Sequence, residues 1–97
     1  MTTNYKRGQK TEERACQELE RVGYYASRSA GSHGIWDVVA VGPTGIRLIQ
    51  CKRTKQYYQS DYEQAKEQLR GLPMLPGVSR EIWVWRDNEG GVIQEVV

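Results

Sequence analysis

Two short apolar runs in the first half of the chain each carry a charged residue, and this constrains the fold more than any other feature. Residues 35–41 contain Asp37, and residues 46–52 end in Lys52. Strands made of apolar residues rarely accept ions, because burying an unpaired charge is costly. The Gly-Pro-Thr-Gly sequence at 42–45 favours a chain reversal. We therefore predict a hairpin in which Asp37 and Lys52 meet at the same end.

Side-chain alternation along the second run brings a third polar group to that end. Leu48, Gln50 and Lys52 share one face of the predicted strand, since successive side chains point to opposite faces. Such a cluster can hold a metal ion beside a group that handles protons. The alternative is an edge hairpin whose polar ends are simply exposed to water.

A predicted helix over residues 11–21 adds a carboxylate. Its apolar positions, at 15, 16, 19 and 22, follow a helical stripe that reaches Glu12 one turn earlier. Glu12 thus lies on the side of the helix that faces the core, whereas Glu13 is expected to be solvated. The alternative for Glu12 is a carboxylate that only complements the helix dipole, with Thr11 as the cap. Gly23 is typical of a helix end.

The remaining elements indicate an α/β or α+β domain with a mixed sheet flanked by helices. The pattern predicts a short strand at 24–28, a loop of small residues at 29–34 and a helix at 61–70. A connector without regular structure is expected at 72–77, followed by strands at 82–85 and 92–97.

Length and cysteine usage narrow the class of protein. The 97 residues are expected to form one domain, with residues 1–10 as a flexible basic arm. We see no membrane span and no signal peptide, and Cys16 and Cys51 are expected to be buried free thiols. A cytoplasmic protein fits these observations.

The charge is distributed unevenly along the chain. Residues 1–55 contain ten Lys and Arg against five Asp and Glu, whereas residues 56–97 contain four against seven. Basic groups around a carboxylate site suggest a polyanionic substrate whose phosphates they position. The alternative is a solvated surface that happens to be basic. The basic residues that bracket the predicted site are Lys6, Arg7, Lys10, Arg14, Arg28, Lys52, Arg53 and Lys55.

Two apolar features suggest self-association. Trp83 and Trp85 alternate with Val84, so the two indoles share a face that belongs to the core or to a dimer interface. The connector with Met74 and Leu75 is a second candidate interface. A homodimer is therefore expected.

Several of these residues together resemble a known family. They are Arg7-Gly8, Glu12, Gly23-Tyr24, Arg28-Ser29-Ala30-Gly31-Ser32, Asp37-Val38-Val39-Ala40 and Gln50-Cys51-Lys52. In this order and spacing, over about half of the chain, they resemble the archaeal-type Holliday junction resolvases of the PD-(D/E)XK nuclease superfamily.

The resemblance implies a restriction-endonuclease-like fold and a symmetric dimer. It also implies that four-way DNA junctions are nicked in a reaction that depends on Mg²⁺, or on Mn²⁺ in its place. Asp37 would be the main metal ligand, joined by Glu12 and by Gln50 at the second acidic position of the motif. Lys52 would orient or deprotonate water, and Arg28 and Ser32 would contact the scissile region. The expected DNA contacts are Lys6, Arg7, Lys10, Arg28, Ser29, Ser32, His33, Arg53 and Lys55.

Gln50 departs from the family, which usually has glutamate at this position. A glutamine coordinates a cation only through its carbonyl oxygen, and the lost charge weakens metal binding and makes Glu12 more important. Two alternatives stay open. One is another structure-specific or repair endonuclease that cuts flaps or duplex, and the other is a non-catalytic junction-binding module on a degenerate nuclease fold.

Overall fold

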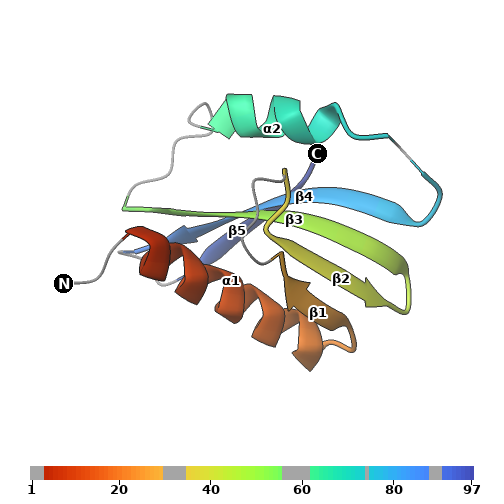
Figure 1. Ribbon diagram of the computed structural model, residues 1–97, viewed down its shortest axis with the longest axis horizontal. Coiled ribbons are helices and arrows are strands. Elements are labelled where there is room, and N and C mark those ends of the chain that lie inside the picture. Colours follow the sequence, from red (N-terminus) through yellow and green to blue (C-terminus); the bar gives the residue numbers. More distant parts are fainter. Residues whose placement is uncertain (1–3, 30–34, 56–61, 74, 88–90) are drawn as a thin grey trace.

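The computed structural model describes residues 4–29, 35–55, 62–73, 75–87 and 91–97, with side chains from residue 9 onward. These residues form two helices and one five-stranded sheet, in the strand order β1-β2-β3-β4-β5 (Figure 1). The elements in chain order are α1 (Asn4–Arg21), β1 (Tyr25–Arg28), β2 (Val38–Gly42), β3 (Gly45–Thr54), α2 (Glu63–Arg70), β4 (Val78–Arg86) and β5 (Val92–Val96).

The sheet is mixed, and the two helices lie on its two faces. β3 and β4 are parallel, whereas the other three neighbouring pairs are antiparallel. A parallel pair needs a long crossover connection, which the segment containing α2 supplies. α1 contacts β1, β2 and β3, whereas α2 contacts β4 from the opposite side (Figure 1). The predicted α+β class with a mixed sheet is confirmed, and the arrangement is that of a restriction-endonuclease-like fold.

Helix α1 begins at Asn4, so the predicted start at Thr11 is wrong. Thr11 is 4% exposed and lies inside the helix, which excludes it as the cap. Lys, Arg and Gln are good helix formers, and a helix already held by its packed part extends at the cost of one residue at a time. The predicted end is confirmed at Arg21, and Gly23 follows with φ +99°.

The predicted hairpin is confirmed as β2 and β3, with Gly42 opposite Gly45 and Val38 opposite Ile49. The run 35–41 predicted Asp37 inside the first strand. β2 instead starts at Val38, so Asp37 lies just before the strand. Gly45 has φ +123°, and a Cβ there would lie 2.1 Å from the carbonyl oxygen of Gly77. This turn therefore needs a glycine both for its backbone angle and for its close approach to the connector.

Two strands, β3 and β4, are longer than the apolar runs that predicted them. β4 pairs with β3 over nine residues from Val78 onward and therefore includes the polar residues 79–81, which sequence alone left outside the strand. Helix α2 begins at Glu63, and position 61, where its start was predicted, lies outside the described residues. Pairing with a long neighbouring strand overrides the local preference of polar residues.

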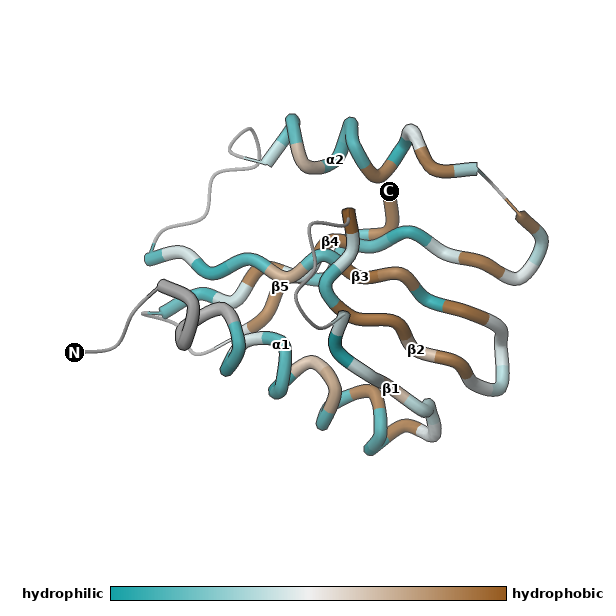
Figure 2. Tube along the Cα trace, in the orientation of Figure 1, coloured by the Kyte–Doolittle hydropathy of each residue, from teal (hydrophilic) through white to brown (hydrophobic). Residues whose placement is uncertain are grey.

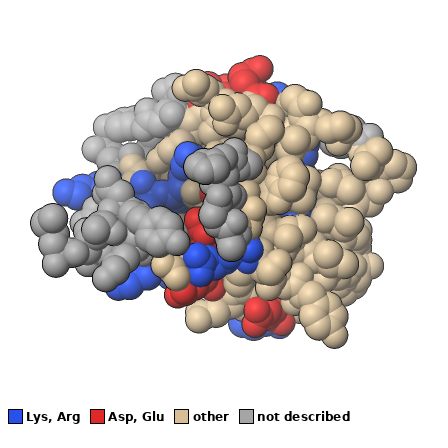
Figure 3. Space-filling model, in the orientation of Figure 1, with Lys and Arg blue, Asp and Glu red and all other residues tan. Residues whose placement is uncertain are grey.

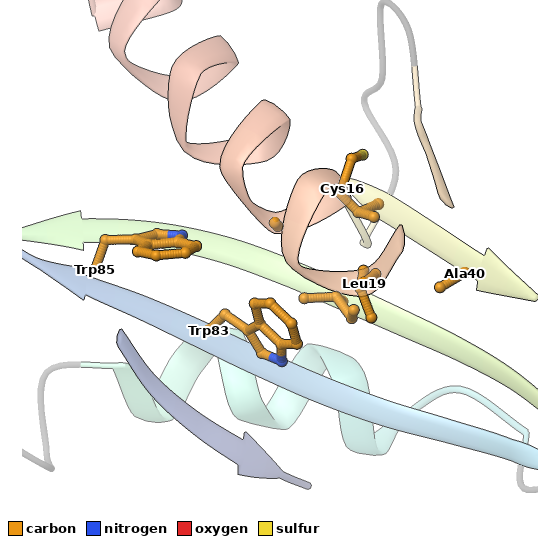
Figure 4. Close-up of a cluster of buried hydrophobic side chains, with 8 residues drawn as sticks. Cys16, Leu19, Ala40, Trp83 and Trp85 are labelled. Atoms are coloured by element: carbon orange, nitrogen blue, oxygen red, sulfur yellow. The ribbon is translucent and has the colours of Figure 1, made fainter. Parts of the chain in front are cut away.

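Alternate side chains of β4 pack into two separate hydrophobic cores. Trp83 and Trp85 pack with Leu19 of α1 and Ala40 of β2, as Figure 4 shows, and Trp83 is 1% exposed. This places both indoles in the core, one of the two predicted alternatives. Figure 2 shows that β2, beside this packing, is mostly hydrophobic. The second core, under α2, contains Leu69, Ile82, Val84 and, partly buried around them, Ile35, Tyr62, Ala65, Leu72, Ile93 and Val97.

Both cysteines are free thiols, as predicted, although only Cys16 is buried and Cys51 is half-buried. Neither described helix is long and apolar enough to cross a membrane.

Candidate active site

Asp37 is held by its backbone and by its side chain where three strands meet. Its N–H donates to the carbonyl of Ile49 (2.9 Å), and its own carbonyl accepts from the N–H of Ser29 (2.8 Å). Its carboxylate oxygen Oδ2 accepts from the backbone N–H of Cys51 at 2.9 Å. The carboxylate is therefore fixed against β3, between the positions of Gln50 and Lys52, as the predicted hairpin required.

The charge of Asp37 is only partly compensated. Burial raises the pKa of Asp37 above its usual value, while the hydrogen bond from Cys51 and the positive charge of Lys52 act in the opposite direction. The net shift is upward. Lys52 is thus close enough to Asp37 for the two charges to interact, and a further cation at this carboxylate would be favourable.

Glu12 of α1 approaches the same place from the helix. Burial raises the pKa of Glu12, the hydrogen bond from Arg28 lowers it, and the negative charge of Asp37 raises it again, for a net upward shift. The guanidinium Nε of Arg28 donates to Glu12 Oε1 at 3.2 Å. A carboxylate whose pKa is raised both by burial and by a second carboxylate is typical of functional sites, because a bound cation would relieve the unfavourable charge.

Gln50 contributes an uncharged side-chain oxygen to this region. Its Oε1 atom is buried and has no hydrogen-bond partner within the described part of the chain. A buried oxygen without a partner is costly, so such an atom in a native structure calls for a ligand or a role. Asp37, Glu12 and Gln50 offer oxygen ligands only, the kind that a hard divalent cation such as Mg²⁺ prefers.

The donor set is poor in charge. Within the described residues, no group of three or more His, Cys, Asp or Glu side chains is placed to hold a metal ion. The candidate ligands are therefore two carboxylates and one amide oxygen, from Asp37, Glu12 and Gln50.

The predicted DNA contacts fall into three groups. Arg28 and Ser29 border the carboxylate site, Arg28 through Glu12 and Ser29 through its backbone bond to Asp37. Lys10, Arg53 and Lys55 are exposed, and Arg53 forms an ion pair with Asp87. Ser32 and His33 lie outside the described residues, and of Lys6 and Arg7 only the helical backbone is described. Figure 3 shows Lys and Arg side chains around acidic ones in one half of the view, while the other half is mostly uncharged.

Two contacts near the site were not expected from sequence. Glu13 is exposed, as predicted, but its Oε1 lies 3.7 Å from Nη1 of Arg28, so both neighbouring glutamates of α1 contact this guanidinium. The guanidinium of Arg14 lies over the ring of Trp85, 4.4 Å from its centroid. No local signal in the sequence could reveal either contact, because each depends on how α1 crosses the sheet.

A solved structure has the same fold as this chain. Hjc from Archaeoglobus fulgidus, a Holliday junction resolvase from an archaeal hyperthermophile, matches with a TM-score of 0.67 and 23% sequence identity. The match covers 93% of this chain and 72% of that one. At this identity the likeness establishes the fold. No model of a known protein family matches the chain, and no curated protein matches it.

Proposed function

We propose that this protein is a metal-dependent DNA endonuclease that resolves four-way junctions as a homodimer. One observation carries the proposal. The carboxylate of Asp37, just before β2, is close enough to Glu12 of α1 to raise its pKa, and the neighbouring strand β3 carries Lys52 and the buried, unpartnered oxygen of Gln50. The fold shared with Hjc supports DNA junctions as the substrate.

The residues divide the chemistry between them. A divalent cation held by Asp37, Glu12 and Gln50 would polarise the scissile phosphate and lower the pKa of an attacking water. Lys52, beside Asp37, orients that water and stabilises the negative charge that develops on the phosphate. Arg28 neutralises a phosphate oxygen in the same transition state.

The Glu12–Arg28 ion pair would be the resting arrangement of the site in the protein without DNA. In this pair the guanidinium of Arg28 binds the carboxylate of Glu12. The side chain of Glu12 is 21% exposed and that of Arg28 is 28% exposed. A DNA phosphate that takes over Arg28 releases Glu12 for the cation, while Glu13 stays within reach of the guanidinium. Metal and DNA binding would then reinforce each other. Lys10, Arg53 and Lys55 would grip the flanking backbone without reading sequence.

The proposal is tested by offering a synthetic four-way junction and a matched linear duplex with Mg²⁺, Mn²⁺ or EDTA. We expect paired nicks on opposing strands of the junction that depend on the metal. The Asp37→Asn variant should bind the junction but leave it uncut. Equal cutting of the duplex would indicate a general nuclease. Tight junction binding without cutting in either metal would indicate a binding module, the alternative that Gln50 favours.

A further inference from the structure

A groove opens between β3 and α2, directly beside the candidate active site. Its volume is about 420 Å³, within the usual range for ligand sites. Two of its lining residues, Gln50 and Lys52, come from the strand that supplies the candidate catalytic groups. The other lining residues are Tyr62, Gln64, Ala65 and Gln68, from α2 and the residue before it.

The groove is polar, but its described lining carries a single charge. Lys52 is the only ionic side chain among these residues, and none of them is acidic. Gln64 and Gln68 are exposed and four residues apart on α2, so their amides lie on one side of the helix. Each amide offers one acceptor and two donors, the combination that recognises the edge of a nucleobase. A phosphate, by contrast, is bound through cationic groups.

The position of the groove relates it to the reaction. Lys52 belongs to the groove and interacts with Asp37, and Gln50 immediately precedes Cys51, whose N–H binds the Asp37 carboxylate, so a molecule in the groove is a neighbour of the group being cut. The part of the nucleic acid next to a scissile phosphate is a nucleoside. Tyr62 and Ala65 add apolar surface for its ring, and the three glutamines add amides for its edge.

We propose that this groove binds the nucleoside of one nucleotide adjoining the scissile phosphate, with Gln64 and Gln68 as positioning residues for its base. This inference rests on the proposed nuclease function and adds a second wall, helix α2, to its site. A base can reach such a groove only by leaving the helical stack, which costs less where the DNA is branched than in intact duplex. The groove therefore favours branched over linear DNA, independently of how two protomers are spaced.

An abasic scan of the substrate tests the inference with the unaltered protein. Junctions are made with one abasic nucleotide at each position within three of the cut, and single-turnover cleavage is measured in Mg²⁺. We expect a loss of about tenfold at one position beside the cut and little effect elsewhere. A flat scan on junctions that are cut efficiently would overturn the groove while leaving the nuclease function intact. If intact junctions are not cut in Mg²⁺ or Mn²⁺, the proposed function fails, and the groove fails with it.

The variant Gln64→Ala/Gln68→Ala locates the effect on α2. We expect it to cut the intact junction about tenfold more slowly, to bind it within about twofold of the unaltered protein, and to be insensitive to the critical abasic site. Gln94→Ala is the matched control, since Gln94 is exposed on β5 opposite Trp83, which packs toward α1. The inference would be overturned if Gln94→Ala slowed cleavage as much as the double variant does. It would also be overturned if the abasic site slowed cleavage by the double variant as much as it slows cleavage by the unaltered protein. Circular dichroism checks that both variants are folded.

Discussion

Both ends of β3 bring acidic and basic side chains together, but the two clusters differ in how completely the acid is satisfied. Near the start of the strand, Glu81 of β4 is 3% exposed and accepts two hydrogen bonds of 2.7 Å from the guanidinium of Arg47. Ser79 and the indole of Trp83 donate two more, at 2.7 and 3.0 Å. Near the end of β3, Asp37 accepts one backbone hydrogen bond and Glu12 one from Arg28.

The pKa values follow this difference. Burial opposes the ionisation of Glu81, but the bonds from Arg47, Ser79 and Trp83 outweigh it, and its pKa lies below the usual value. For Asp37 and Glu12 burial prevails, and their pKa values lie above it. A carboxylate buried with four donors stabilises the fold. Carboxylates buried together with too few donors are suited to a ligand that supplies the missing positive charge.

Among these variants, Asp37→Asn should have the largest effect on activity, because it removes a carboxylate from the cluster of Asp37 and Glu12. The amide keeps an oxygen for the Cys51 N–H but loses the charge that holds a cation, so junction cleavage should fall by at least about a hundredfold. The free energy of unfolding, measured with urea, should not decrease. A variant that loses its fold together with cleavage would contradict this division of roles.

Glu81→Gln should break the satisfied cluster with the opposite result. The change leaves Arg47 partly buried without its counter-charge, and we expect a loss of about 3 kcal/mol in the free energy of unfolding. Cleavage at temperatures where the variant is folded should stay within about twofold. Glu18→Gln, which removes an exposed pair with Arg21, serves as the control and should leave stability unchanged. A folded Glu81→Gln variant that cannot cut would show that this end of β3 takes part in the reaction.

Gln50→Glu should sharpen the comparison by adding a negative charge at a proposed metal ligand. A third carboxylate beside Asp37 and Glu12 should lower the Mg²⁺ concentration for half-maximal cleavage by about tenfold. Gln94→Glu adds the same charge on β5 and should not change the requirement. An unchanged requirement in Gln50→Glu would remove Gln50 from the proposed ligands.

Local signals in the sequence were sufficient for the hairpin and for the polar groups at its end. The Gly-Pro-Thr-Gly turn fixes the register of β2 and β3, and alternation then decides which residues share a face with Gln50. The helical stripe through Leu19 likewise placed Glu12 on the buried side of α1, where the structure brings it near Asp37. These are patterns that a chain carries within ten or fifteen residues.

Features that depend on distant partners were missed. Glu81 was not singled out, because its donor Arg47 is 34 residues away and comes close only when β3 and β4 pair in parallel. Lys66 is 2% exposed and pairs with Glu95 of β5 at 2.8 Å, although a lysine in a short polar helix gives no sign of burial. The groove under Gln64 was missed for the same reason, since one of its walls is β3 and the other α2.

The smallest expected effect is in the pH dependence of stability, and it tests the contrast directly. A carboxyl group whose pKa is higher in the folded than in the unfolded protein binds its proton more tightly when folded. Ionised Asp37 therefore costs folding free energy at neutral pH, and the cost disappears as the pH falls through the raised folded pKa toward the usual value of 3.8. In EDTA, Asp37→Asn should thus be slightly more stable than the unaltered protein at pH 7, by less than about 1 kcal/mol. This advantage should vanish as the pH approaches 4.

Glu81 behaves in the opposite way. Its stabilisation is present above the usual value of 4.5 and is lost as the pH falls through the lowered folded pKa, so the deficit of Glu81→Gln should shrink in acid. Urea titrations of the three proteins between pH 3 and 7 measure both slopes, and slopes of the same sign would mean that the two clusters do not differ in the way proposed.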